Sequence, residues 1–305
     1  MKRREFNQLL ALAAASIMTP AVAKQYEKGT HSLIKKTISS TGEKISAIGM
    51  GSSRTFDVAS TENELAVRTE ILRIFFNNGG QMIDSSPMYG RAENVLGHCL
   101  KQLAFPPQLF SATKVWTDGE IEGITQMNKS LRLWNVNQFQ LMQIHNLKDW
   151  KTHIKTLRDW KEKQRIKYIG ITTSHGLRHQ EFESVMKSEK PDFIQLTYNI
   201  SNRQVEERLL PLAQDLGISV IVNRPFMGLF SRIKGKPLPD MAADIQCTSW
   251  AQFFLKFVIS HPAVTCAIPA TSKEKHMHDN MQAAYGDLPD LECRQQMIRA
   301  FHSIN

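Results

Sequence analysis

Three short apolar segments of this sequence each end on an ionisable side chain. The segment "MID" ends on Asp84, "SATK" on Lys114 and "QIH" on His145, and the turn "SSPMYG" places Tyr89 five residues after Asp84. A phenol has a pKa of about 10 and is a weak acid near neutral pH, but a neighbouring ammonium group favours the phenolate and lowers that pKa. If these side chains meet, Tyr89 becomes a proton donor whose acidity is set by Lys114.

Each of these residues also has an ordinary structural explanation. A histidine at the end of a strand can be a hydrogen-bonded structural residue, and a lone lysine can extend its charge to solvent along an apolar surface. The set as a whole is harder to explain by packing, because a buried charge is costly unless it is paired. We therefore predict that Asp84 holds Lys114 charged and oriented within a single site.

The segments around these residues alternate between short apolar runs and longer amphipathic runs. Strand-like runs begin near residues 44, 80, 109, 139, 166, 192, 218 and 263, each followed by a helical pattern. Buried strands separated by helices indicate a parallel sheet, and eight such units over about 260 residues match a (β/α)8 TIM barrel. In that architecture, chemistry lies at the carboxyl ends of the strands.

Beyond the eight strand–helix units, the sequence predicts a short hairpin before the barrel and one helix after it. The turn "STGE" predicts a short N-terminal hairpin that closes the bottom of the barrel, and residues 290–303 predict an extra C-terminal helix. We expect residues 24–305 to form one barrel domain. The alternative is an open doubly wound sheet, for which "GMGSS" offers a GxG pattern but no third glycine and no following helix start.

The first 23 residues, "MKRREFNQLLALAAASIMTPAVA", have the features of a signal peptide. A basic start precedes a mainly apolar run from Leu9 to Met18, which is too short to span a bilayer comfortably, and "AVA" resembles a cleavage site. The pair Arg3 and Arg4 resembles a twin-arginine (Tat) signal, which predicts export to the periplasm by the Tat machinery. An ordinary secretory signal or an uncleaved anchor are the alternatives.

The distribution of charge and the spacing of the cysteines argue against nucleic-acid binding and against a cysteine metal site. The formal charge is +9, but the basic residues are dispersed, without an aromatic-interleaved patch or zinc-finger spacing. This pattern indicates a solvated basic surface rather than nucleic-acid binding, and it suits an anionic cofactor. Cys99, Cys247, Cys266 and Cys293 have no metal-ligand spacing, and we expect free thiols, although export permits a disulfide.

The motifs together resemble the aldo-keto reductase signature. "IDSSPMYGRAENVLG", "TKVW" and "QIHN" carry the resemblance, and "IGIT", "IQLTYN", "NRPF" and "IPATSKEKHMHDN" extend it over essentially all of the mature chain. The resemblance implies a (β/α)8 barrel that reduces aldehydes or ketones with NAD(P)H, or catalyses the reverse. Tyr89 would protonate the alkoxide left by hydride transfer, and His145 would direct an N–H at the carbonyl oxygen. No metal is required.

The same resemblance implies where the nicotinamide binds. Its carboxamide would meet Thr172 and Thr173 at the end of the fifth strand and Gln195 on the sixth. The family usually has Ser and Asn after the fifth strand, so Thr173 is a departure that lacks a side-chain amide. Asn223 stands where the family often has a stacking aromatic, and the guanidinium plane of the adjacent Arg224 could stack instead.

The adenine end is implied at "IPATSKEKHMHDN". Amides and the helix dipole at the start of the last barrel helix favour phosphate, and nearby cations favour a 2′-phosphate, hence NADP(H) over NAD(H). The alternative is a capped, solvated helix start. The candidate residues are Thr271, Ser272 and Lys273 for phosphate, Lys275 and His276 with Lys273 for the 2′-phosphate, and Asp279 and Asn280 for adenine.

The substrate, a small carbonyl compound or alcohol, is poorly specified by the sequence. Phe56, Trp116, Trp150 and Phe226 lie in strand-end loops and are candidates for an apolar pocket, with ordinary packing as the alternative for each. A second hypothesis for the chain is a nucleotide-binding sensor or accessory barrel with little turnover. An exported reductase would also need to recycle its nucleotide in place or accept electrons from a redox partner.

Overall fold

Eight parallel strands form a closed barrel in the computed structural model, which describes residues 32–304. The strands follow one another in chain order around the sheet, and a parallel bridge between Ile48 and Ala267 joins its first and last strands. The N–H of Gly49 donates to the Ala267 carbonyl over 2.8 Å at this seam. The strands are β3 (Met50–Gly51), β4 (Met82–Asp84), β5 (Phe110–Val115), β6 (Phe139–Ile144), β7 (Ile166–Thr172), β8 (Phe193–Thr197), β9 (Ser219–Asn223) and β10 (Val264–Ala267). The predicted (β/α)8 barrel is confirmed.

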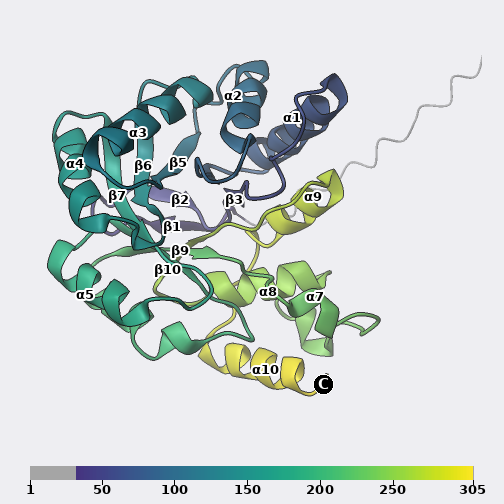
Figure 1. Cartoon of the computed structure of the whole chain (residues 1–305). Helices are drawn as coiled ribbons and strands as arrows, with labels where there is room; N and C mark the ends of the chain where they lie inside the picture. The colour runs from purple at the N-terminus through teal and green to yellow at the C-terminus, as the bar shows by residue number, and fades with distance from the viewer. Residues whose placement is uncertain (1–31, 305) are drawn as a thin grey trace, which may run out of the picture. The chain divides into compact units, whose positions relative to one another are not determined.

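Helices surround the strands (Figure 1). The barrel helices are α1 (Glu62–Asn77), α2 (Ala92–Gln102), α3 (Glu120–Trp134), α4 (Trp150–Glu162), α5 (His179–Glu189), α6 (Leu209–Asp215), α8 (Trp250–Ile259) and α9 (Glu274–Gln282). The loop after β9 contains the short helix α7 (Leu229–Arg232), and 3₁₀ turns lie at His145–Leu147, Gln204–Glu206 and Asp240–Ala242. Polar caps fix several helix starts: Thr61 accepts the Glu64 N–H before α1, and Ser249 accepts the Gln252 N–H before α8.

The predicted hairpin covers the amino-terminal end of the barrel. Strands β1 (Lys35–Thr37) and β2 (Lys44–Ser46) pair antiparallel, and the turn between them contacts the barrel through Thr41, whose Oγ1 lies 2.7 Å from the Tyr168 hydroxyl. The strand-like run predicted to begin near residue 44 is divided between the two sheets, because residues 44–46 pair with β1 and residues 50–51 with β4. The chain crosses between the two sheets at Gly49, where an added Cβ would lie 2.8 Å from the Met82 carbonyl oxygen.

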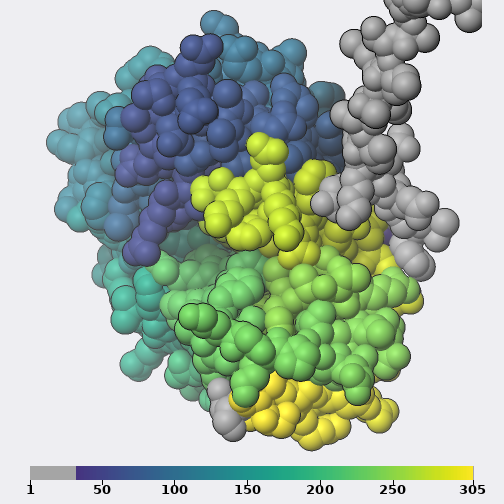
Figure 2. All heavy atoms as spheres, turned by 90° about the vertical axis from the view of Figure 1, so that its right-hand side faces the viewer, coloured from purple at the N-terminus to yellow at the C-terminus, as the bar shows by residue number. Residues whose placement is uncertain are grey.

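One further helix packs against the barrel beside the eight barrel helices. The predicted C-terminal helix, α10 (Leu291–His302), is fastened by Arg294, which donates to the Tyr198 hydroxyl and to Ser260 Oγ, each over 2.6 Å. Figure 2 shows α9 between the blue N-terminal segments and the green residues that follow β9. Its start therefore borders the mouth of the barrel.

The remaining predictions from the sequence concern the N-terminal segment, membrane-spanning helices and the cysteines. The predicted signal peptide, residues 1–23, lies outside the described residues. Across residues 32–304, no helix is both long and apolar enough to cross a bilayer. All four cysteines are free thiols, and Cys99, Cys247 and Cys266 are buried.

Candidate active site

A buried ion pair lies at the carboxyl ends of β4 and β5. Lys114 Nζ is 2.5 Å from Asp84 Oδ2 and 2.7 Å from the Ser85 carbonyl oxygen, and both charged side chains are almost fully buried. Burial alone would lower the pKa of Lys114, but the charges of Asp84 and Tyr89 and the hydrogen bond to Asp84 raise it above its ordinary value. Lys114 is therefore held as an ammonium group, as its pairing with Asp84 predicts.

Two glutamine amides complete the surroundings of Asp84. Its second oxygen, Oδ1, accepts from Gln143 Nε2 at 2.8 Å and from Gln195 Nε2 at 3.0 Å. Gln195 also donates to Gln143 Oε1 and accepts from Asn223 Nδ2 over 3.3 Å. A chain of amides thus runs from β9 across β8 and β6 to the carboxylate, and it fixes the position of Asp84 because buried polar groups are costly unless satisfied.

Gln143 did not emerge from the sequence as a site residue. It sits inside the apolar run "FQLMQIH", and its glycine neighbour Gly170 on β7 leaves room for it: a Cβ there would lie 2.8 Å from Gln143 Cγ. The available signal was a polar residue in a strand that is otherwise buried on both faces.

Tyr89 lies beside this ion pair with its ring half-buried. Lys114 Nζ is 5.3 Å from the centroid of the ring, and the ring meets that of His145 edge-on at a centroid distance of 5.8 Å. Burial raises the pKa of the Tyr89 phenol, and the opposing charges of Lys114 and Arg224 offset this only in part. The expected net lowering is therefore absent, and the phenol holds its proton at neutral pH.

His145 is a neutral hydrogen-bond donor in this arrangement. Burial, with the charge of Lys114 in addition, lowers its pKa to about 3. Its Nδ1 lies 2.9 Å from Ser86 Oγ, which itself accepts the Met88 N–H at 3.2 Å. Nδ1 is thus occupied by Ser86, and Nε2 is the ring nitrogen left for another group.

These side chains open into a cavity of about 790 Å³ at the barrel mouth. Its lining includes Asp84, Tyr89, His145, Thr172, Thr173, Gln195, Asn223, Arg224 and Phe226. Lys114 lies behind the wall, fully buried. All of these residues were predicted to lie in the site, and we refer to this space as the reactive cavity.

The carboxamide contacts expected around β7 are already hydrogen-bonded within the protein. Thr172 Oγ1 accepts the Asn146 N–H at 2.9 Å, and Thr173 Oγ1 donates to the Leu177 carbonyl at 2.5 Å. The amide that Thr173 lacks is present nearby, because Asn223 Nδ2 donates to the Thr173 carbonyl at 3.0 Å. Asn223 thus supplies a side-chain amide from the adjacent part of the barrel mouth.

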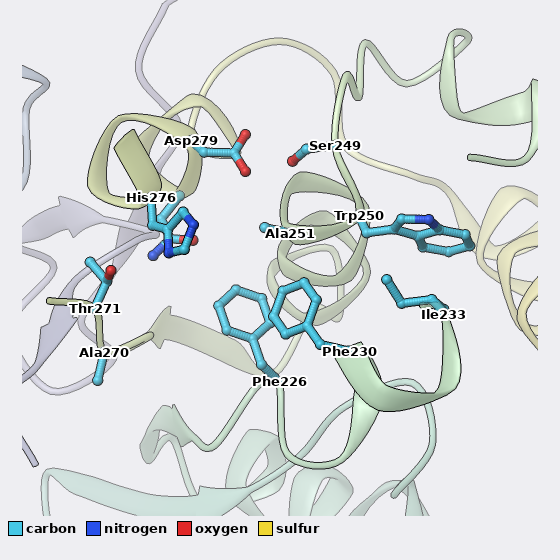
Figure 3. Close-up of a pocket in the computed structure, with 11 residues that line it drawn as sticks. Phe226, Phe230, Ile233, Ser249, Trp250, Ala251, Ala270, Thr271, His276 and Asp279 are labelled. Atoms are coloured by element: carbon cyan, nitrogen blue, oxygen red, sulfur yellow. The ribbon is translucent and has the colours of Figure 1, made fainter. Parts of the chain in front are cut away.

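A second cavity, of about 340 Å³, lies between α8 and the start of α9 (Figure 3). The rings of Phe226 and Phe230 form one wall, and His276 and Asp279 face the space from α9. Asp279 is held by Gln252, which donates to its Oδ1 over 2.7 Å. We refer to this space as the helix cavity; it shares Phe226 and Ala270 with the reactive cavity.

The candidates for the adenine end divide between this cavity and the surface. The lining includes Thr271, His276, Asp279 and Asn280. Ser272, Lys273 and Lys275 are exposed and do not belong to it. The cations expected for a 2′-phosphate therefore lie outside the cavity, apart from His276.

Of the four candidate pocket aromatics, Phe226 lines the reactive cavity. Trp116 does not belong to the lining, but it is 38% exposed and its ring centroid lies 6.4 Å from that of His145, which does. Phe56 is instead fully buried in the hydrophobic core, because its N–H bonds to the Ser52 carbonyl and folds the loop inward. Trp150 is also absent from the cavity lining: its Nε1 donates to Glu181 and its ring packs against the core.

The chain is thus a (β/α)8 barrel whose mouth carries a buried Asp–Lys pair, a Tyr and a neutral His. The sequence model of the aldo/keto reductase family matches residues 47–296. The chain belongs to this family.

Individual relatives are distant but extend over most of the chain. A methylglyoxal reductase of Escherichia coli is 24% identical over 254 residues, covering 81% of this chain and 88% of the relative. The L-galactose dehydrogenase of Arabidopsis thaliana is 24% identical and covers 88% and 93%. An aldo/keto reductase structure from Klebsiella pneumoniae in complex with NADP and acetate has a TM-score of 0.71 at 20% identity, covering 88% and 96%, and shows the shared fold.

Proposed function

We propose that this protein is an exported, NADP(H)-dependent reductase of aldehydes or ketones that can also run in the alcohol-oxidising direction. One observation carries the proposal: Tyr89 stands between the buried Lys114–Asp84 pair and the neutral His145, all at the reactive cavity. Membership of the aldo/keto reductase family and the named activities of the relatives support it.

Each side chain has a distinct role in carbonyl reduction. The bound nicotinamide supplies the hydride. His145 donates its Nε2–H to the carbonyl oxygen and positions it, and Tyr89 transfers its hydroxyl proton to that oxygen as negative charge develops. Lys114 stabilises the phenolate that remains, while Asp84, fixed by the glutamine amides, keeps Lys114 in place.

The cavities fit a dinucleotide. Two spaces share the walls formed by Phe226 and Ala270, one beside Tyr89 and one beside the start of α9. Asn223 and Thr173 would hold the nicotinamide end, and Thr271, Asp279 and Asn280 the adenosine end, with the exposed Lys273 and Lys275 near a 2′-phosphate. The structural relative from Klebsiella pneumoniae contains NADP, which supports NADP(H) over NAD(H).

A steady-state assay tests the reductase proposal against the sensor alternative. Purified protein is mixed with NADPH and a panel of aldehydes and ketones, and NADPH oxidation is followed by absorbance. Turnover that disappears in Tyr89→Phe supports the enzyme. Saturable NADPH binding without turnover of any carbonyl compound would favour a sensor or accessory barrel.

Export is part of the same proposal. The twin-arginine-like start, Arg3 and Arg4, suits a protein that folds and loads its nucleotide before it crosses the membrane, since the Tat route carries folded proteins. In the periplasm the enzyme would keep the nucleotide and recycle it with a second substrate or a redox partner.

Two experiments test export and pre-loading separately. The variant Arg3→Lys with Arg4→Lys should remain cytoplasmic. Wild-type protein purified from the periplasm should carry nucleotide through gel filtration. Unchanged export would indicate the ordinary secretory route, and nucleotide-free protein with weak NADPH binding would contradict pre-loading.

A further inference from the structure

A buried carboxyl group that the proposed mechanism does not use lies behind the reactive cavity. Glu93, in the first turn of α2, is 2% exposed. Thr113 Oγ1 donates to its Oε1 over 2.6 Å and Trp134 Nε1 to the same oxygen over 3.1 Å, and Ser130 Oγ donates to Oε2 over 2.8 Å. Two of these donors belong to α3 and the third to β5, so Glu93 joins three elements of the barrel.

Stability alone does not explain a carboxyl group at this position. Burial raises the pKa of Glu93, and its three donors with the charge of Lys114 offset this only in part. Replacing buried charged groups with apolar side chains of similar volume is often neutral or stabilising. The helices α2 and α3 also meet closely elsewhere, since an added Cβ at Gly97 would overlap the Leu133 carbonyl oxygen. The packing of these helices therefore does not depend on Glu93 alone.

Glu93 is one helical turn away from the proton donor along the chain. The Tyr89 carbonyl accepts the N–H of Ala92, the first residue of α2, at 3.0 Å, and the Tyr89 N–H donates to the Ser86 carbonyl at 2.9 Å. The turn that carries Tyr89 thus runs directly into the helix that carries Glu93. A contact that fixes the start of α2 therefore also fixes the place of Tyr89.

Through Thr113, Glu93 also holds the strand that carries Lys114. Thr113 precedes Lys114 on β5, and successive side chains of a strand point to opposite faces. Thr113 therefore points to Glu93 and the helices, whereas Lys114 points into the barrel. Burial acts to lower the pKa of Lys114, and the charge of Glu93, with those of Asp84 and Tyr89, helps to offset it. A single carboxyl group thus connects the segments of Tyr89 and Lys114.

We propose that Glu93 is a positioning residue for proton transfer, and that its bond to Thr113 sets the place of Lys114 relative to Tyr89. The inference rests on the proposed reductase function and adds a residue to the machinery of the same site. Lys114 Nζ lies 5.3 Å from the centroid of the Tyr89 ring, and it must keep this placement to stabilise the phenolate. A misplacement of about 1 Å at a reacting group can cost about 10²-fold in rate. The bond that governs the rate is therefore the one from Glu93 to β5, and not the two from Glu93 to α3.

A pair of matched variants separates positioning from stability. Thr113→Val keeps the shape of the side chain and removes the bond to β5, whereas Ser130→Ala removes a bond between the same carboxyl group and α3. Both variants should lower Tm by similar amounts. With NADPH and 4-carboxybenzaldehyde, Thr113→Val should lower kcat by about 10- to 100-fold and change KM by less than about 3-fold. Ser130→Ala should leave kcat unchanged, and equal values of kcat in the two variants would overturn the proposal.

Glu93→Gln separates position from charge. The amide oxygen can accept from Thr113 and Trp134 and the amide nitrogen can donate to Ser130, so the three bonds persist while no negative charge remains. Because the bond to β5 is kept, kcat should stay within about 3-fold of the wild-type value and the pH dependence of kcat/KM should keep its shape. A loss as large as that of Thr113→Val, with a shifted pH profile, would assign the effect to charge and overturn the positioning role.

A spectroscopic measurement tests the proposal without turnover. Protein labelled with carbon-13 at tyrosine Cζ gives an NMR signal for Tyr89, which is assigned by its absence in Tyr89→Phe. Thr113→Val should shift this signal further than Ser130→Ala does, because only the first change moves Lys114 relative to the phenol. That shift in a protein that reduces no carbonyl compound would uphold the positioning of Lys114 while contradicting the reductase proposal. A Tyr89 signal left unchanged by Thr113→Val would overturn the positioning role whatever the activity.

Discussion

The reactive cavity and the helix cavity open at the same barrel mouth but are built differently. In the reactive cavity, Asp84, Gln143 and Gln195 project from strand ends and are buried and hydrogen-bonded to one another. The helix cavity is formed by loop and helix-start residues, among them the exposed Phe230 and the partly exposed Asp279. Strand ends fix side chains by the register of the sheet, whereas loops leave their placement to local packing. Changes at the two cavities should therefore differ in size and in kind.

The largest effect is expected at the ion pair of the reactive cavity. Lys114→Met removes the cation that pairs with the buried Asp84 carboxylate, and breaking a buried pair in this way costs about 3–5 kcal/mol of stability. It should also lower carbonyl turnover by about 10²–10⁴-fold, since Tyr89 loses its stabilising charge. Urea unfolding and steady-state kinetics measure the two effects. Adding Asp84→Asn should recover stability but not turnover, and a single variant as stable as the wild type would contradict the pairing account.

A second effect concerns acid stability. The folded-state pKa of His145, about 3, lies below the usual value of 6.5. The unfolded chain therefore binds a proton that the folded chain does not, and stability falls as the pH drops from about 6.5 toward 3. At pH 5 this amounts to about 2 kcal/mol. His145→Gln should lose less stability between pH 8 and pH 5 than the wild type in urea unfolding. Identical losses would mean that His145 titrates normally.

The amide chain behind Asp84 should contribute a smaller amount. Gln143→Leu removes a donor to Asp84 Oδ1 and one of the two acceptors of Gln195 Nε2, which costs about 1–3 kcal/mol. Asp279→Asn is the matched change in the helix cavity, where partial exposure should limit the effect to about 0.5 kcal/mol. Thermal unfolding of both variants measures the contrast. Equal changes in Tm for the two variants would show that the buried and the partly exposed polar residues contribute equally to stability.

The smallest effect is expected at the exposed lysines beside the helix cavity. Lys273→Gln with Lys275→Gln should reduce the preference for NADPH over NADH by no more than about 5-fold, because exposed charges interact weakly with a ligand through solvent. Titration of both nucleotides by fluorescence, repeated at high salt, gives the ratio. An unchanged ratio would assign the 2′-phosphate to other residues, and a loss well above 5-fold would show that the lysines move onto the bound nucleotide.

The same contrast explains which parts of the fold and site could be predicted from the sequence. Hydrophobic periodicity gave the eight units, and polar residues at the ends of apolar runs indicated Asp84, Lys114 and His145, because register alone brings them to one edge. Gln143 was missed because it lies within an apolar run. Phe56 was misplaced because its side chain packs into the hydrophobic core, which the position of the residue in a loop after a strand does not indicate.

The pKa shifts and the orientation of loop and helix-start side chains were the features hardest to predict from the sequence. The direction of the Tyr89 pKa shift depends on how burial compares with the Lys114 charge, and the sequence states neither quantity. Which residues of α9 face the helix cavity also depends on how that helix begins between α1 and α8, so His276 and Asp279 could not be separated from Lys273 and Lys275 in advance. Arg54 and Arg224 come from loops far apart in the chain, and the closed barrel brings them to one cavity.

The most direct test of the central claim, that Tyr89 protonates a carbonyl oxygen during hydride transfer, is a single-turnover experiment. Enzyme loaded with NADPH carrying deuterium in both C4 positions is mixed with 4-carboxybenzaldehyde, and the product is analysed by mass spectrometry. Wild-type protein should yield the alcohol with one deuterium on its carbinol carbon. Tyr89→Phe, which lacks only the hydroxyl, should bind the same nucleotide but form product at least about 10²-fold more slowly. Labelled alcohol formed at the wild-type rate by Tyr89→Phe would contradict the account.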